Sequence, residues 1–191
     1  MTPVVVAKVG GSLFDLPDLR ERLVRWAAGV EAGRILLVPG GGEAADVIRR
    51  LDRVHHLGES AAHWLAIRMM AVNAHVLAAL LDVPVTGSAR QPAATPVAVL
   101  DAHAFCRDDE GGPGAVEHSW RVTSDSIAAR VATVLGGQLV LLKSVELPDG
   151  FSWEAAASAG LADEAFPEVV RRHPVSVTWV NLRRPGQNSR E

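Results

Sequence analysis

The chain has 191 residues, a formal net charge of −3 and a single cysteine, and its length fits one large or two small domains with room for a cofactor-sized cleft. The weak negative charge, without any run of basic residues, argues against a nucleic-acid surface, and one cysteine cannot form an internal disulfide. Because we find neither a leader pattern nor an apolar run approaching about 20 residues, we expect a cytoplasmic protein with no membrane partner.

Strands and helices alternate along the first half of the chain. Residues 3–9 (PVVVAKV) form a continuous β-branched run that is typical of a buried strand. Apolar residues then recur at helical spacing over 16–33, and 34–42 (RILLVPGGG) reads as a second buried strand that ends in glycines. Two further segments with helical periodicity, 43–54 and 59–82, complete a β-α-β-α-α order.

The second half continues the same alternation. Strands are predicted over 95–100, 138–145 and 175–182, with a helix over 124–137. Residues 107–118 read as a long loop, and 183–191 as a frayed tail. Alternating strands and helices predict an α/β fold, a three-layer sandwich whose mainly parallel sheet is covered by helices on both faces.

Glycines follow the first two predicted strands directly, in KVGGS (8–12) and PGGG (39–42). Backbone N–H groups of such segments can approach an anion, and the helix that follows adds a favourable dipole. A tight turn would explain the glycines alone. It does not explain Lys8, which lies inside a strand that should be buried.

Lys8 and Lys143 are the only lysines among the 19 Lys and Arg residues, and both lie at the carboxyl ends of predicted strands. Base composition could account for the scarcity, but an ammonium and a guanidinium are not interchangeable at a phosphate. In TSD (123–125), Thr123 or Ser124 can cap the helix that begins there. Asp125 is placed to hold a lysine in position.

The sequence has no GxxxxGK[ST], GxGxxG after the first strand, CxxC, HExxH or GxSxG. What remains is two glycine segments, two lysines and one carboxylate at strand ends. Phosphoryl transfer fits this set, because its catalysis consists mainly of positioning two anions and neutralising their charge. One glycine segment would hold the donor and the other the acceptor.

KVGGS, PGGG and TSD, in this order and spacing, resemble the amino acid kinase superfamily over nearly the whole chain. Within it, AAHWLAIRMM, WRVTSDSIAA and LLKSV are most similar to the small [5-(aminomethyl)furan-3-yl]methyl phosphate kinases of the methanofuran pathway. The resemblance implies the amino acid kinase fold, with an acceptor half over about 1–105 and a nucleotide half over about 119–182. It also implies ATP as donor, Mg²⁺ carried by the nucleotide, a small phosphate as substrate and a homodimer.

The resemblance also assigns residues. It implies that Lys8 bridges the two phosphoryl groups and that Asp125 orients Lys8, with Lys143 as a further catalytic lysine. The nucleotide phosphates are expected at Gly10, Gly11, Ser12, Lys143 and Ser144. The acceptor is expected at Gly40, Gly41 and Gly42, and we add as candidates His63, Asn73 and Ser124.

Some features leave alternatives open. The Trp and Met residues that share the long helix with His63 are more typical of a core or a dimer interface, and Trp120 either covers the site or packs. Larger members of the superfamily carry a further lysine in a distal glycine-rich loop, which this chain lacks. A non-catalytic nucleotide- or oxyanion-binding protein, or a kinase of carboxylates, would fit the same motifs.

Overall fold

The computed structural model describes residues 3–90 and 95–184. Within these ranges the chain forms a six-stranded sheet with the order β3-β4-β2-β1-β5-β6, and every neighbouring pair is parallel. The predicted α/β sandwich around a parallel sheet is therefore confirmed. The strands are β1 (Val4–Val9), β2 (Arg34–Pro39), β3 (Val85–Thr86), β4 (Val97–Leu100), β5 (Gln138–Lys143) and β6 (Val177–Asn181).

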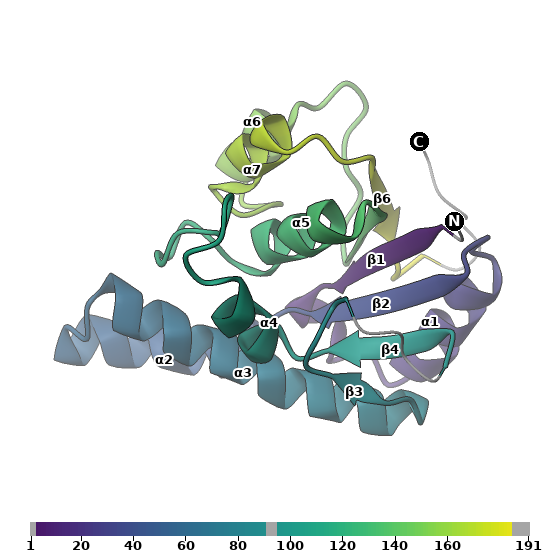
Figure 1. The fold of residues 1–191 in the computed structure, drawn as a ribbon, viewed down its shortest axis with the longest axis horizontal. Coiled ribbons are helices and arrows are strands. Elements are labelled where there is room, and N and C mark those ends of the chain that lie inside the picture. Colours follow the sequence, from purple (N-terminus) through teal and green to yellow (C-terminus); the bar gives the residue numbers. More distant parts are fainter. Residues whose placement is uncertain (1–2, 91–94, 185–191) are drawn as a thin grey trace.

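Helices cover both faces of the sheet (Figure 1). One face carries α5 (Ser124–Leu135), α6 (Trp153–Ser158) and α7 (Phe166–Arg172). The other carries α1 (Leu19–Ala28) and the C-terminal half of α3 (Glu59–Leu81). Two more helices pack against α3, namely α2 (Gly42–His55) and α4 (Ala102–Asp109).

The side chains of β1 alternate between two apolar clusters. Val5, Ala7 and Val9 pack in the cluster that contains α1, whereas Val6 packs in the cluster that contains α5. Burial on both faces explains why the strand reads as a continuous apolar run. The two-residue period then places the next even-numbered side chain, Lys8, on the α5 face.

Four elements differ from the sequence-based expectation. β3 has only two residues, and α6 and α7 are too short to show a helical period. The loop predicted at 107–118 begins later, because α4 runs to Asp109 after the Asp101 carboxylate accepts hydrogen bonds from the first N–H groups of that helix.

The predicted tail is described only as far as residue 184. Arg183 is held in place, since its guanidinium donates to the Ser12 carbonyl at 2.8 Å and to Asp15 at 2.6 Å. Residues 185–191 lie outside the described part of the chain.

The expectation that no segment is apolar enough to span a bilayer is wrong for α3. This 23-residue helix meets the length and composition of a membrane span. His63 and Asn73, read in the sequence as candidate site residues, masked that feature. Its contacts with α2, α4, β2 and β4 are those of a helix that belongs to the domain, and 28% of its apolar window is buried there.

Candidate active site

The candidate site lies at the carboxyl edge of the sheet. β1 and β2 are neighbours, and so are β1 and β5. Since all three strands run in the same direction, Gly10, Gly40 and Lys143 emerge at one edge, which is where ligands collect in open α/β sheets.

The two lysines lie on the same face of neighbouring strands. Lys8 pairs with Leu141 across the β1–β5 ladder, and Lys143 follows Leu141 by two residues. A spacing of two returns a side chain to the same face, so both lysines point toward α5. Asp125 is in the first turn of that helix.

Asp125 bridges the two lysines. Its Oδ1 is 3.0 Å from Lys8 Nζ and its Oδ2 is 2.8 Å from Lys143 Nζ. All three residues are buried, at 6% exposed for Lys8, 3% for Asp125 and 8% for Lys143. Burial by itself would raise the pKa of the Asp125 carboxyl, but the charges of the two lysines outweigh it and hold the pKa below its ordinary value.

Lys143 is the more constrained of the two lysines. Its ammonium also donates to the Leu161 carbonyl at 2.6 Å and lies 5.1 Å from the ring centroid of Trp179. Burial, with the nearby charge of Lys8, lowers the pKa of Lys143 to about 8, although Asp125 acts in the opposite direction. This lysine therefore exchanges its proton near neutral pH.

The two glycine segments are in direct backbone contact. A Cβ on Gly11 would lie 2.4 Å from the Gly42 nitrogen, and one on Gly40 would lie 2.7 Å from the Gly11 nitrogen. Gly42 has a φ of +52°, which disfavours other residues. Close packing of the two loops therefore requires glycine at these positions, whatever ligand they bind.

Asn73 supports this contact from α3. Its side-chain amide donates to the carbonyl oxygens of Gly40 at 2.7 Å and Gly41 at 2.9 Å. Asn73 is not among the residues that line the pocket described next. Both amide hydrogens are thus engaged by the loop, and Asn73 also lines the second cleft described below.

Asp163 is a site residue that the sequence did not reveal. Its carboxylate accepts hydrogen bonds from the N–H groups of Thr123 and Ser126 and from both hydroxyls, at 2.5–3.1 Å, and its own N–H donates to Asp125. Burial and the nearby charge of Asp125 raise the pKa of Asp163. Thr123 occupies the N-cap position of α5, as expected, but its side chain makes no cap hydrogen bond, and Asp163 accepts from the N–H groups there from a distant segment.

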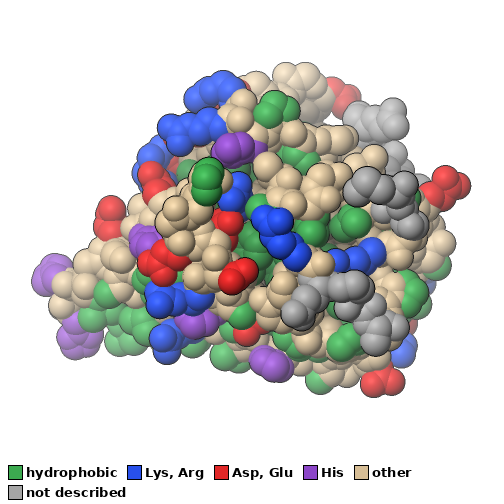
Figure 2. All heavy atoms as spheres, in the orientation of Figure 1, with side chains coloured by type: hydrophobic (Ala, Val, Ile, Leu, Met, Phe, Trp, Pro, Cys, Tyr) green, Lys and Arg blue, Asp and Glu red, His purple; other side chains and the backbone are tan. Residues whose placement is uncertain are grey.

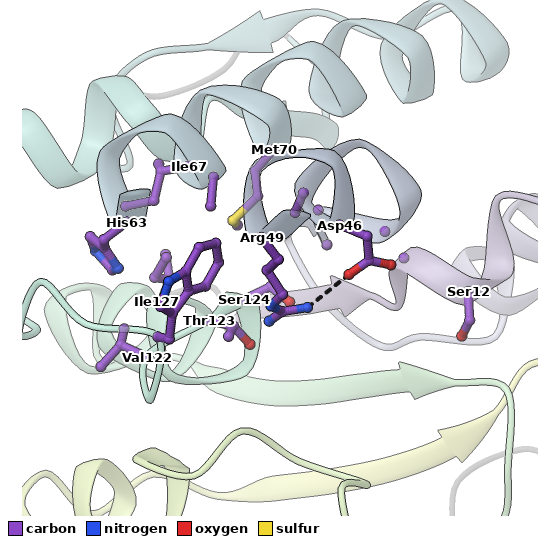
Figure 3. Close-up of a pocket in the computed structure, with 17 residues that line it drawn as sticks. Ser12, Asp46, Arg49, His63, Ile67, Met70, Val122, Thr123, Ser124 and Ile127 are labelled. Atoms are coloured by element: carbon purple, nitrogen blue, oxygen red, sulfur yellow. Dashed lines mark hydrogen bonds and ion pairs between the residues drawn. The ribbon is translucent and has the colours of Figure 1, made fainter. Parts of the chain in front are cut away.

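A pocket of about 200 Å³ opens beside the glycine segments (Figure 3). Ser12 and His63 lie at opposite ends of it in Figure 3, with Ile67, Met70, Val122 and Ile127 between them. The hydroxyl-bearing Thr123 and Ser124 face it as well, together with Gly11 and Gly40–Gly42. Arg49 and Asp46 line it too, so that apolar side chains on one wall of its middle face charged and hydroxyl-bearing ones.

Trp120 forms part of the wall of this pocket. Its indole N–H donates to Asp52 of α2 at 2.8 Å, and the Arg49 guanidinium lies 4.9 Å from its ring centroid. Arg49 also pairs with Asp46 at 2.9 Å, the contact dashed in Figure 3. Of the two sequence-based alternatives for Trp120, covering the site fits these contacts.

The remaining predicted residues lie where β1 and β5 end. The hydroxyls of Ser12 and Ser144 are 2.9 Å apart and so join the end of β1 to the end of β5. A second cleft, of about 500 Å³, is lined there by Ser12, Asp15, Glu43 and Arg183. Gly10 is held to β5 by a 2.9 Å hydrogen bond from its N–H to the Leu142 carbonyl.

Comparison with known proteins shows the family of this chain. The model of the Amino acid kinase family matches residues 3–146. The chain belongs to the amino acid kinase family. Over 196 residues it is 27% identical to the [5-(aminomethyl)furan-3-yl]methyl phosphate kinase of Methanocaldococcus jannaschii, covering 94% of this chain and 88% of that one.

Solved structures show the same fold. Uridylate kinase from Archaeoglobus fulgidus has a TM-score of 0.61 at 16% identity, covering 94% of this chain and 89% of that one. UMP kinase from Bacillus anthracis has the same TM-score at 13% identity, covering 97% and 89%. From its family and its relatives we conclude that the chain is a small-molecule kinase, as the motifs predict.

Proposed function

We propose that this amino acid kinase transfers a phosphoryl group from ATP to the phosphate of a small monoester, forming a diphosphate. The observation that carries the proposal is the Asp125 carboxylate held between the ammonium groups of Lys8 and Lys143, beside two glycine segments. Donor and acceptor are both anionic, so a phosphate-to-phosphate transfer needs fixed positive charge between them.

The lysines retain hydrogen-bonding capacity for this task. An ammonium has three N–H groups. Lys143 uses two of them in hydrogen bonds, whereas Lys8 makes an ion pair with Asp125 that lacks hydrogen-bond geometry. Lys8, in the central strand, would bridge donor and acceptor, and Asp125 would orient both lysines. Lys143 would take the role of the distal lysine that larger family members carry.

The pocket between Ser12 and His63 would hold the acceptor, with its phosphate toward Gly40–Gly42 and Ser124. The donor phosphates would lie toward Gly10, Gly11, Ser12 and Ser144. When bound, ATP with its Mg²⁺ supplies the transferable phosphoryl group and part of the countercharge. Mg²⁺ would be carried by the nucleotide phosphates.

The named substrate of the Methanocaldococcus jannaschii relative suggests the acceptor. We propose a furanylmethyl phosphate with an aminomethyl group, in methanofuran-type one-carbon cofactor biosynthesis. A ring of this size would pack on the apolar wall that Ile67, Met70 and Ile127 give to a pocket of about 200 Å³.

The test is an ADP-release assay with a panel of acceptors, namely furanylmethyl, isopentenyl and nucleoside monophosphates and a set of carboxylates. We expect release with a phosphate monoester and its loss in Lys8→Ala, with circular dichroism to confirm folding. A hydroxylamine trap that captures acyl phosphate would instead indicate a carboxylate kinase. Calorimetric ATP binding without turnover of any acceptor would indicate a non-catalytic binding protein.

We also propose that the active form is a cytoplasmic homodimer that pairs through α2 and α3. Exposed apolar side chains follow one stripe on each helix, and hydrophobic atoms gather in the lower left of Figure 2, where α2 and the beginning of α3 lie. The stripes are Val47, Leu51 and Val54 on α2 and Val72, Val76 and Leu80 on α3.

Sedimentation velocity tests the homodimer. We expect Val76→Glu to produce a monomer, because a buried charge without a partner is costly. Val145→Glu is the matched control, since Val145 is also exposed, at 43% against 51% for Val76, but follows β5 and belongs to neither helix. A monomeric wild type would refute the homodimer.

A further inference from the structure

The end of the pocket opposite the glycine segments is formed by His63, which is 2% exposed. Its Nδ1 lies 3.0 Å from the Ser119 carbonyl oxygen. A carbonyl oxygen only accepts hydrogen bonds, so Nδ1 must carry the hydrogen. In the neutral ring the other nitrogen, Nε2, then has a lone pair and no hydrogen.

One observation favours the neutral ring, and a second shows that Nε2 has no partner. Burial lowers the pKa of His63, aided by the neighbouring charge of His118, although the Ser119 hydrogen bond and Glu117 act in the opposite direction. Nε2 is itself buried and has no hydrogen-bond partner among the described residues. A buried polar atom without a partner is costly, so it points to a ligand group.

The position of His63 separates it from the phosphate end. Met70 reaches the glycine segment, with its Cγ 3.8 Å from where a Cβ on Gly41 would lie. His63 precedes Met70 by seven residues of α3, which corresponds to about 10 Å of helix axis. The apolar side chains of Ile67 and Ile127 line the pocket between them, and Arg49 lines it as well.

We infer that His63 Nε2 accepts a hydrogen bond from a donor group, an ammonium or a hydroxyl, at the end of the acceptor molecule opposite its phosphate. This inference rests on the proposed function and adds to it a requirement that the acceptor must meet. The acceptor has an anionic end at the glycines, an apolar middle and a hydrogen-bond donor at His63. His63 is thus a specificity-determining residue and not a phosphate ligand.

The first arm of the test measures kcat/KM for three acceptors that differ in one group. These are [5-(aminomethyl)furan-3-yl]methyl phosphate and its counterparts with hydroxymethyl or methyl in place of aminomethyl. In the wild type we expect the better of the aminomethyl and hydroxymethyl compounds to have a kcat/KM about 10–100-fold above that of the methyl compound, because the methyl group leaves Nε2 unpaired. The ranking of aminomethyl and hydroxymethyl identifies the donor.

The variant His63→Leu should abolish this discrimination, mainly by slowing the donor-bearing acceptors. The matched control is His103→Ala, because His103 also contacts Trp64 but does not line the pocket. The control should keep the discrimination. A wild type that does not discriminate, or a preference that persists in His63→Leu, would overturn the inference.

The second arm uses the wild type alone, so it does not depend on the folding of a variant or on turnover. Long-range ¹H–¹⁵N spectra of ¹⁵N-histidine protein should show His63 protonated at Nδ1 only, with an Nε2 shift on adding the donor-bearing phosphates but not the methyl compound. This result would stand even if no acceptor were phosphorylated, which is the outcome that would refute the proposed kinase reaction. Protonation of Nε2 in the complex, or no response to any of the three phosphates, would overturn the inference.

Discussion

The substitution Asp125→Asn removes the only charge that the described structure places between the two buried lysines. Breaking a buried ion pair by deleting one partner costs about 3–5 kcal/mol, because the other charge remains buried and unpaired. Asp125 has two such partners, at 3.0 and 2.8 Å, so we expect a loss in this range or above it. With a urea m value of about 2–3 kcal/mol/M, the unfolding midpoint should fall by about 1–2 M.

This loss should depend on pH in a defined direction. The pKa of Lys143 is about 8 in the folded wild type against 10.5 for an ordinary lysine, so folding is favoured as pH rises between these values. Without Asp125 the folded pKa drops further, and Lys143 sheds its proton earlier. The stability difference between wild type and variant should therefore shrink by about 1 kcal/mol between pH 7 and 9.

The assay is equilibrium urea unfolding at pH 7, 8 and 9. Asp109→Asn is the matched control, because Asp109 makes two 2.8 Å hydrogen bonds to Arg130 in a largely buried pair away from the site. An arginine does not titrate in this range, so that variant should lose stability equally at each pH. A loss below about 1 kcal/mol for Asp125→Asn, or a loss that grows with pH, would refute the reasoning.

Three further predictions follow from the same contacts. In urea unfolding, Gly11→Ala should lower the free energy of unfolding by about 1–3 kcal/mol or more, because the added methyl group overpacks against Gly42. Gly160→Ala is the control, since Gly160 has a φ of +69° but no neighbour within 4 Å. It should lower the free energy of unfolding by only about 1–2 kcal/mol. If the charge of Lys143 is needed, kcat/KM should fall above pH 8, and Lys143→Arg should lack this decline. A flat wild-type profile would contradict that role. Asp163→Ala should lower the free energy of unfolding by about 2–4 kcal/mol, since the cap of α5 is lost, and an unchanged urea midpoint would contradict it.

The sequence predicted the site residues that lie at the ends of strands. Lys8 and Lys143 interrupt apolar runs, and a parallel sheet brings the ends of such runs to one edge. The structure adds that Asp125 serves both lysines, not Lys8 alone. The spacing of the residues in the sequence could not show this double contact, because the contact depends on both lysine side chains facing α5.

Other parts had no sequence signal. Asp163 lies in a connecting segment and acts through a contact that spans about 40 residues, so no local pattern marks it. The glycines were read as anion-binding segments, but the packing of one loop on the other also requires them. α6 and α7 were missed because helices of six or seven residues barely complete two turns.

The central claim is that the chain makes a diphosphate from a phosphate monoester, and ³¹P NMR of the reaction mixture tests it directly. With ATP, Mg²⁺ and [5-(aminomethyl)furan-3-yl]methyl phosphate, we expect ADP and a new pair of mutually coupled phosphorus doublets, and neither with Lys8→Ala. Unchanged ATP across the whole panel of phosphate monoesters, or a product whose phosphorus shows no coupling to a second phosphorus, would contradict the account.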